Sequence, residues 1–390
     1  MKELTPQTTK KPFGFNIIGF ATANLGLGVA LRNMVALLEQ LQYPFCVLDI
    51  DPGGNRTGHD GSVLIHSVQA GKPLPFGVNV FFMNPPSVES LFRDLPDLVE
   101  TKGHMNITVL FWELPSLPTT WKSLLNRMDL ILVPSRFIGT AIRTAEIQTP
   151  TLFFRQGLSQ MPTAVCDRQR WGFPENKTCF MFSFDVSSGV QKKNPLGVLQ
   201  AFKMAFPSGE AELIFKVNNR TISPEAGLVV DKLKEWITEV QGVRILDQTF
   251  AYKDVLSLYA SADVFVSLHR GEGLGLGLME SMALGKPTIA TGWSGNMDFM
   301  DNSNACLIPF TLVPLDEGTQ YHAQSHGASQ VWADPDLIVA ATWMRRLSQS
   351  VELREEIGAK ARESIRSLQA EISRGEVFSE VRSCYEKMYF

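Results

Sequence analysis

The sequence is poor in charge, and its charges almost cancel. Asp, Glu, Lys and Arg make up 19% of the 390 residues, and the formal net charge is −4; an average soluble protein has about 25% charged residues. With 44% hydrophobic residues and so little net charge, the chain is not intrinsically disordered. The absence of a basic excess argues against a dedicated nucleic-acid-binding protein. At about 100–200 residues per domain, the length predicts two or three domains.

Cysteine and histidine are also scarce. The five cysteines are odd in number and far apart in the sequence. No Cys-x-x-Cys pair and no cysteine–histidine cluster has the spacing of a zinc site. The pattern favours reduced, mostly buried thiols in a cytoplasmic protein.

Long hydrophobic runs are almost absent. The segment most similar to a membrane span is the run of twenty uncharged residues between Lys11 and Arg32. Within it, the triplet at 21–23 (Ala-Thr-Ala) resembles a signal-peptide cleavage site. A membrane span needs about 20 mainly apolar residues. This stretch is interrupted by asparagines, a threonine and four glycines, and Glu3 lies in the segment before it. We therefore expect a strand and a loop here, and no anchor.

The order of hydrophobic segments indicates an α/β fold. Near the N-terminus, two segments with the composition of buried strands flank one with helical spacing of apolar residues (13–20, 45–50 and 29–41). Such βαβ units form parallel sheets, and a similar series begins near residue 179. We predict one α/β domain at 1–160 and another at 178–365, joined by a linker at 161–177 that is rich in Pro, Gln and charge.

The segment Ser267–Asn296 has the sharpest pattern for chemistry. It reads as strand, glycine loop, helix and strand, with Glu272 in the loop and Glu280 eight positions later, among alternating glycines (Gly271, Gly273, Gly275 and Gly277). Glycines let a ligand approach the backbone, and a helix N-terminus suits phosphate. A carboxylate repels phosphate, so a sugar or ribose hydroxyl is its better partner. The alternative is a plain βα turn with one exposed glutamate and one in the first helical turn.

These residues resemble a known family. The segment is similar to the E-x7-E region of retaining glycosyltransferases with the GT-B fold, in particular glycosyltransferase family four. The segment 184–202 (FDVSSGVQKKNPLGVLQAF) resembles the basic loop of that family, and 259–273 and 332–336 (WADPD) resemble a bacterial branch linked to exopolysaccharide assembly. The resemblance implies two Rossmann-like domains that face each other across a deep cleft, and a C-terminal helix at 366–390 that packs back on the first domain.

The resemblance also implies roles for individual residues. Glu280 would bind the ribose hydroxyls of a nucleotide diphosphate, and Glu272 would contact hydroxyls of the donor sugar. Lys193 would neutralise the pyrophosphate. Backbone N–H groups would hold the sugar and phosphate at Leu274, Gly275 and Leu276.

One cation of the family pattern is missing. Members usually have an arginine five residues before the lysine, and that position is Ser188 here. Either Arg270 or Lys192 would supply the missing charge. In the first domain, the histidine that many members place near the donor sugar is absent, and the sequence has Phe-Trp-Glu-Leu-Pro at 111–115. Trp112 and Glu113 would either line the site or have a structural role.

The first glycine pair admits two interpretations. In the resemblance, Gly26 and Gly28 would lie under the donor phosphates. Alternatively, Gly26-Leu27-Gly28 after a strand, with Asp49 about 20 residues on, mimics a dinucleotide-binding fingerprint in which Leu31 replaces the third glycine. That alternative predicts an NAD(P)- or FAD-dependent oxidoreductase.

A second acidic pattern also has two interpretations. Asp49 and Asp51 form an Asp-x-Asp sequence, which is a metal signature in a different glycosyltransferase fold. The alternative is a turn at the end of a strand. Since GT-B enzymes generally need no metal in catalysis, the resemblance implies no metal site and no cofactor.

The resemblance finally implies a reaction. A UDP- or GDP-linked sugar is the donor, a saccharide or a lipid-linked saccharide is the acceptor, and the anomeric configuration is retained. Glu272, Lys193 and Arg270 are the expected catalytic residues. A lipid-linked acceptor would place the enzyme at the inner face of the cell membrane as a peripheral protein. A non-catalytic nucleotide-sugar-binding protein is a third alternative.

Overall fold

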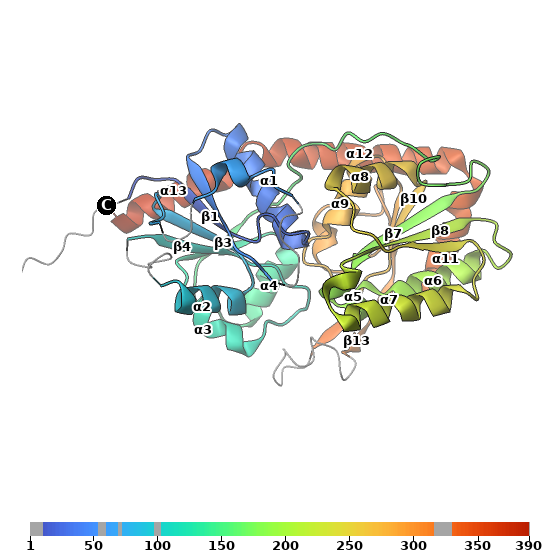
Figure 1. The fold of residues 1–390 in the computed structure, drawn as a ribbon, viewed down its shortest axis with the longest axis horizontal. Helices are drawn as coiled ribbons and strands as arrows, with labels where there is room; N and C mark the ends of the chain where they lie inside the picture. The colour runs from blue at the N-terminus through green and yellow to red at the C-terminus, as the bar shows by residue number, and fades with distance from the viewer. Residues whose placement is uncertain (1–10, 54–59, 69–71, 97–102, 316–329, 390) are drawn as a thin grey trace, which may run out of the picture.

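Two α/β halves lie side by side in the computed structural model (Figure 1). It describes residues 11–53, 60–68, 72–96, 103–315 and 330–389. The strands of these residues form two six-stranded sheets and one two-stranded sheet.

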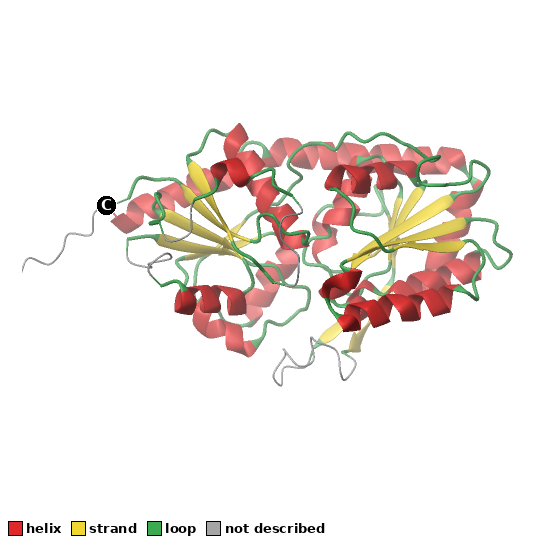
Figure 2. Ribbon diagram, in the orientation of Figure 1, coloured by secondary structure: helices red, strands yellow, loops and turns green. Residues whose placement is uncertain are grey.

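The first half contains a parallel sheet with the strand order β2-β1-β3-β4-β5-β6. Its central strands are buried along their whole length because helices cover both faces (Figure 2). The strands are β1 (Phe15–Gly19), β2 (Phe45–Asp49), β3 (Val78–Phe82), β4 (Met105–Val109), β5 (Leu130–Val133) and β6 (Thr151–Phe153). The helices are α1 (Gly26–Gln40), α2 (Pro85–Asp94), α3 (Lys122–Leu125) and α4 (Arg136–Thr144), with 3-10 turns η1 (Leu64–His66) and η2 (Thr119–Trp121).

The second half repeats this architecture with the order β12-β11-β10-β7-β8-β9. Its strands are β7 (Cys179–Asp185), β8 (Glu212–Asn218), β9 (Val243–Leu246), β10 (Val264–Ser267), β11 (Thr288–Thr291) and β12 (Cys306–Ile308). Its helices are α5 (Val190–Lys193), α6 (Pro195–Ala205), α7 (Pro224–Ile237), α8 (Tyr252–Ser261), α9 (Leu276–Ala283) and α11 (Leu337–Gln349), with 3-10 turns η3 (Val186–Ser188), η4 (Arg220–Ile222) and η5 (Gly295–Asp298). An antiparallel hairpin of β13 (Phe310–Pro314) and β14 (Val331–Pro335) stands apart from the sheet.

The predicted fold class is confirmed, since both halves are parallel doubly wound sheets. In such sheets, ligands bind at the carboxyl ends of the strands where the strand order reverses. In the first sheet the strand order changes direction between the neighbouring strands β1 and β3. In the second sheet it changes direction between β7 and β10. Loops that follow β1 and β4 contact loops that follow β7, β8 and β10, so the two carboxyl edges face each other.

The C-terminal helices join the halves. Helix α12 (Val351–Ile372) runs along both halves, and α13 (Glu376–Tyr389) lies against the first sheet (Figure 1). Ile365 belongs to a core cluster of the second half, whereas Phe378 and Tyr385 belong to the core of the first. Gly375, at φ +67°, separates the two helices. The expected return of the C-terminal helix to the first domain is therefore present.

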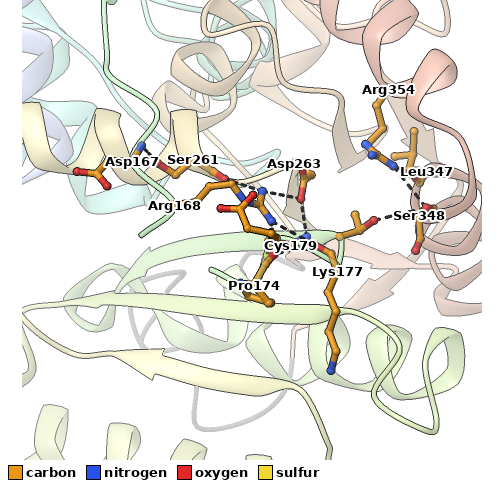
Figure 3. Close-up of polar contacts among 12 residues, drawn as sticks. Asp167, Arg168, Pro174, Lys177, Cys179, Ser261, Asp263, Leu347, Ser348 and Arg354 are labelled. Atoms are coloured by element: carbon orange, nitrogen blue, oxygen red, sulfur yellow. Dashed lines mark hydrogen bonds and ion pairs between the residues drawn. The ribbon is translucent and has the colours of Figure 1, made fainter. Parts of the chain in front are cut away.

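The segment predicted as a linker is built into the second half. Trp171 and Phe173 are buried in one of its core clusters. The Arg168 guanidinium lies at the amino ends of β7 and β10. It donates to the carbonyls of Ser261, Pro174 and Lys177 and forms an ion pair of 3.0 Å with Asp263 (Figure 3). These bonds tie the connecting chain to the amino edge of the second sheet, opposite its carboxyl edge.

The uncharged stretch near the N-terminus forms β1, a turn and the start of α1, in line with the expected strand. Helix α1 begins earlier than predicted, so Gly26 and Gly28 lie in its first turn and not in a loop. The first N–H groups of a helix have no intrahelical partner, and glycine is tolerated there. None of the helices in the described part of the chain combines the length and hydrophobicity that a bilayer span requires.

Candidate active site

The candidate site lies where the carboxyl edges of the two sheets meet. Lys192, at the end of α5, forms an ion pair of 2.8 Å with Glu113, which follows β4 in the first half. Asn219, which follows β8, donates from Nδ2 to the carbonyl of Asn24 at 3.4 Å. The residues singled out in the sequence surround these two contacts.

Glu272 and Lys193 form a partly buried ion pair at this edge. The Lys193 ammonium contacts Glu272 Oε1, and the two side chains are 18% and 14% exposed. Burial alone would raise the pKa of Glu272, but Lys193, His269 and Lys192 together lower that pKa to about 2. Two hydrogen bonds to the segment after β11 fix the loop: the Glu272 N–H donates to Ser294 Oγ, and the Glu272 carbonyl accepts from Gly295 N–H. Glu272 is therefore an ionised carboxylate in a fixed position.

Glu280 lies in the second turn of α9 and is 5% exposed. Tyr252 Oη donates to its Oε1 at 2.8 Å. Burial raises the pKa of Glu280 to about 7, while the Tyr252 hydrogen bond and the Lys216 ammonium lower it. Glu272 is only partly exposed, and Glu280 is buried in the second turn of α9, which contradicts the alternative of an exposed glutamate and one in the first helical turn.

Two buried titratable groups near these glutamates have no counterpart in the predicted site. Lys216 on β8 is 1% exposed, and burial lowers its pKa to about 8. His269, which follows β10, is fully buried, and neither ring nitrogen has a hydrogen-bond partner among the described residues. Burial, with Lys193 and Lys192, lowers the pKa of His269 to about 4, so the ring is neutral at pH 7. Lys216 could have been predicted from the sequence, because it is a lysine within the otherwise hydrophobic strand segment ELIFKVN.

The glycines of the motif have separate structural functions. Gly275 has φ +93° and immediately precedes α9, whose first turn contains no acidic residue and has no side-chain cap. The backbone of Leu274, Gly275 and Leu276 thus stands at an uncapped helix N-terminus, which attracts anions. A methyl group at Gly271 would lie 2.4 Å from the carbonyl oxygen of Glu113. Gly271 is therefore needed for the approach of the first half.

We expect Gly271→Ala to lower the free energy of unfolding by about 1–3 kcal/mol, because the new methyl group forces the two halves apart. The matched control is Gly26→Ala, where no atom lies within 4 Å of the added Cβ and the change should stay within about 0.5 kcal/mol. Chemical denaturation measures both variants. Equal stability of the two would contradict the contact.

Gly26 and Gly28 differ in their surroundings. A methyl group at Gly28 would lie 2.5 Å from the carbonyl oxygen of Ala23, so this glycine permits the turn before α1. Both carboxylate oxygens of Asp49 accept from Thr22, one from N–H and one from Oγ1. Asp51 accepts from the Gly53 N–H. The Asp51–Gly53 bond is that of a turn at the end of a strand, the alternative to a metal-binding Asp-x-Asp, and Asp49 joins the end of β2 to the turn after β1.

Arg270 points to a different part of the structure from Glu272. Its guanidinium lies 5.0 Å from the centroid of the Trp332 ring and forms an ion pair of 3.0 Å with Asp334, both on β14. Ser188 Oγ donates to the carbonyl of Asp185. The structure thus brings Lys193 to Glu272, Lys192 to Glu113, and Arg270 to the hairpin.

Comparisons with known proteins agree with this geometry. Residues 221–314, which include both glutamates, match the sequence model of the family described as Glycosyl transferases group 1. No curated protein is significantly similar to the chain.

Similar solved structures have the same fold. Sucrose-phosphate synthase from Thermosynechococcus elongatus is 14% identical, with a TM-score of 0.68 over 95% of this chain and 99% of that one. Anabaena HepE in complex with UDP and glucose is 14% identical, with a TM-score of 0.65 over 95% and 100%. The pneumococcal O-GlcNAc transferase GtfA in complex with UDP and GlcNAc is 12% identical, with a TM-score of 0.53 over 80% of this chain and 57% of that one. The chain has the GT-B fold of these glycosyltransferases.

Proposed function

We propose that this protein is a retaining glycosyltransferase that moves a sugar from a nucleotide diphosphate to an acceptor hydroxyl. The observation that carries the proposal is the partly buried Glu272–Lys193 pair beside the uncapped N-terminus of α9, at the facing carboxyl edges of the two sheets. The family match over residues 221–314 and the GT-B fold support it. In this assignment, residues 1–160 bind the acceptor and residues 178–365 bind the donor.

The proposed mechanism assigns one task to each group. Glu280 accepts hydrogen bonds from the ribose hydroxyls, and Glu272 accepts them from the donor sugar. As the glycosidic bond to phosphate breaks, negative charge grows on the leaving pyrophosphate; Lys193 and the backbone N–H groups of α9 offset it. Preorganised charge of this kind usually contributes more to catalysis than any other single effect. A leaving phosphate oxygen takes the acceptor proton, so the mechanism uses no separate general base and no metal.

The substrate classes follow from the same resemblance. The donor is a UDP- or GDP-sugar, and UDP is the nucleotide bound in the Anabaena and pneumococcal structures. The acceptor is a saccharide or lipid-linked saccharide of bacterial exopolysaccharide synthesis, which would bring the protein to the cytoplasmic face of the membrane.

A ligand panel tests the proposal. Thermal unfolding is measured with UDP, GDP, UDP-glucose, GDP-mannose, NAD and FAD; a ligand at 100 times its Kd adds about 2.7 kcal/mol of stability. We expect stabilisation by one nucleotide diphosphate and its sugar, followed by release of that nucleotide when labelled sugar is transferred. Stabilisation by NAD or FAD alone would instead identify an oxidoreductase. Binding of a nucleotide sugar without transfer or hydrolysis would identify a non-catalytic binding protein.

A further inference from the structure

The β13–β14 hairpin places side chains of the second half in the core of the first. The chain leaves the second sheet after β12 and returns to it at α11, and Figure 1 shows β13 at the lower edge of the molecule. Trp332 on β14 is fully buried, and with Leu315 it belongs to a hydrophobic cluster whose other buried members come from the first half. Those members are Leu110, Trp112, Leu114, Leu117, Trp121, Leu125, Ile131, Val133, Ile138, Ala141 and Ile142.

A polar contact fixes the hairpin at the same place. Gln330 Nε2 donates to the carbonyl of Ser116 at 2.7 Å. Trp112 Nε1 donates to the same carbonyl at 2.8 Å. Trp112 directly precedes Glu113, the partner of Lys192. The hairpin is thereby joined to the turn of the first half that contacts the motif loop.

The hairpin is also bonded to the motif loop itself. Ala333 N–H donates to the carbonyl of Arg270 at 3.0 Å, and the Arg270 side chain lies over Trp332 and pairs with Asp334. Arg270 N–H in turn donates to the carbonyl of Lys192 at 2.8 Å. Two residues after Arg270, the chain reaches Glu272.

We propose that Trp332 and Arg270 are positioning residues that set the place of Glu272 relative to the first domain. This inference rests on the proposed function for the role of Glu272. Trp332 is buried in the core of the first domain, and the Arg270 side chain lies over Trp332. The position of the loop at 270–272 therefore depends on both residues. A displacement of about 1 Å at a reacting group can cost about 100-fold in rate, so a loose hairpin would harm transfer without removing any group that contacts the donor. The Arg270 cation acts here on the hairpin and not on phosphate.

The first test is independent of activity. Hydrogen–deuterium exchange is compared for the wild type, Trp332→Ala and the control Trp343→Ala, in which the removed indole packs on the core of the second half. We expect Trp332→Ala to speed exchange both in residues 110–142 and in 270–274, and Trp343→Ala to speed it only around α11. Unchanged exchange in 270–274 with Trp332→Ala would overturn the proposal. If that variant does not fold, Gln330→Ala, which removes the bond to the Ser116 carbonyl, replaces it in the same comparison.

The second test separates positioning from simple structural support. With the nucleotide sugar selected by the ligand panel, Trp332→Ala and Arg270→Met should lower kcat for transfer about tenfold or more. The Kd of the nucleotide should change less than about threefold, the fraction of donor lost to hydrolysis should rise, and Trp332→Phe should restore most of the transfer. Weaker nucleotide binding with Arg270→Met at unchanged kcat would make Arg270 a phosphate cation and overturn the inference. If the wild type transfers no sugar, the proposed function fails, and the exchange experiment still decides whether the hairpin positions the loop.

Discussion

Replacement of Glu272 with glutamine or alanine should lower sugar transfer by about 100- to 1,000-fold, equivalent to about 3–4 kcal/mol of transition-state stabilisation. Glutamine keeps the shape of the side chain but removes the charge that holds Lys193 in place. The Lys193 ammonium would then lose its partner in a nearly buried position. Both the contact to the donor sugar and the placement of the cation that offsets the leaving phosphate are affected.

Initial rates with a labelled donor, at saturating acceptor, measure this effect, and calorimetric titration with UDP or GDP measures nucleotide binding separately. The matched control is Glu212→Gln, because Glu212 also pairs with a cation, Arg244, but lies at the amino end of β8, away from the cleft. We expect the control to retain at least about half of the wild-type rate, as is usual for substitutions away from the site. Equal rates for Glu272→Gln and the wild type would remove Glu272 from the mechanism.

The sheets can be predicted from sequence because each strand carries its own signal. Buried parallel strands are continuous hydrophobic runs, and this signal locates β1, β2 and the start of β7 to within about two residues. The sequence spacing of Glu272 and Glu280 also places both carboxylates at one edge of the second sheet, where Glu272 is partly buried and Glu280 is buried.

Contacts between the halves cannot be predicted in this way, because no local pattern encodes them. No residue of β13 is fully buried, and Trp332 on its partner strand is buried by residues more than 180 positions away. Gly271 resembles a ligand-facing glycine in sequence, whereas its missing side chain makes room for the carbonyl of Glu113. From its charge alone, Arg270 is predicted to lie beside the donor phosphate. In the structure it pairs with Asp334, which is 64 residues further along the chain. In each case the deciding neighbour lies in a distant segment.

Binding of a nucleotide sugar should weaken as the pH falls below about 7, by up to about tenfold per pH unit, and Glu280→Gln should abolish this dependence. Burial raises the pKa of Glu280 to about 7. Only the ionised carboxylate accepts hydrogen bonds from two ribose hydroxyls, so protonation competes with binding. The glutamine variant should bind about tenfold more weakly than the wild type at about pH 8, since charge-assisted hydrogen bonds are roughly twice as strong as neutral ones.

The contribution of Glu280 to the stability of the ligand-free protein should change in the opposite direction with pH. Because the pKa of Glu280 is higher in the folded chain than in the unfolded chain, the folded state holds its proton between about pH 4.5 and 7 while the unfolded state has lost it. The contribution of Glu280 to stability is therefore fully present below about pH 4.5 and is lost as the pH rises to about 7. His269, whose pKa is lowered to about 4, contributes with the opposite sign in the same range. The contribution of Glu280 is therefore measured as the difference between the pH profiles of the wild type and Glu280→Gln.

The titration uses UDP-glucose or GDP-mannose and not the free nucleotide, because the terminal phosphate of UDP or GDP itself takes up a proton in this range. Tyr252→Phe is the informative companion: it removes the hydrogen bond that lowers the pKa of Glu280, so the midpoint should move to higher pH while the slope stays the same. The Lys216 ammonium also lowers this pKa, and Lys216→Met should move the midpoint in the same direction. An affinity that does not vary between about pH 5.5 and 8 in the wild type, or a slope that persists in Glu280→Gln, would show that Glu280 does not bind the ribose as a carboxylate.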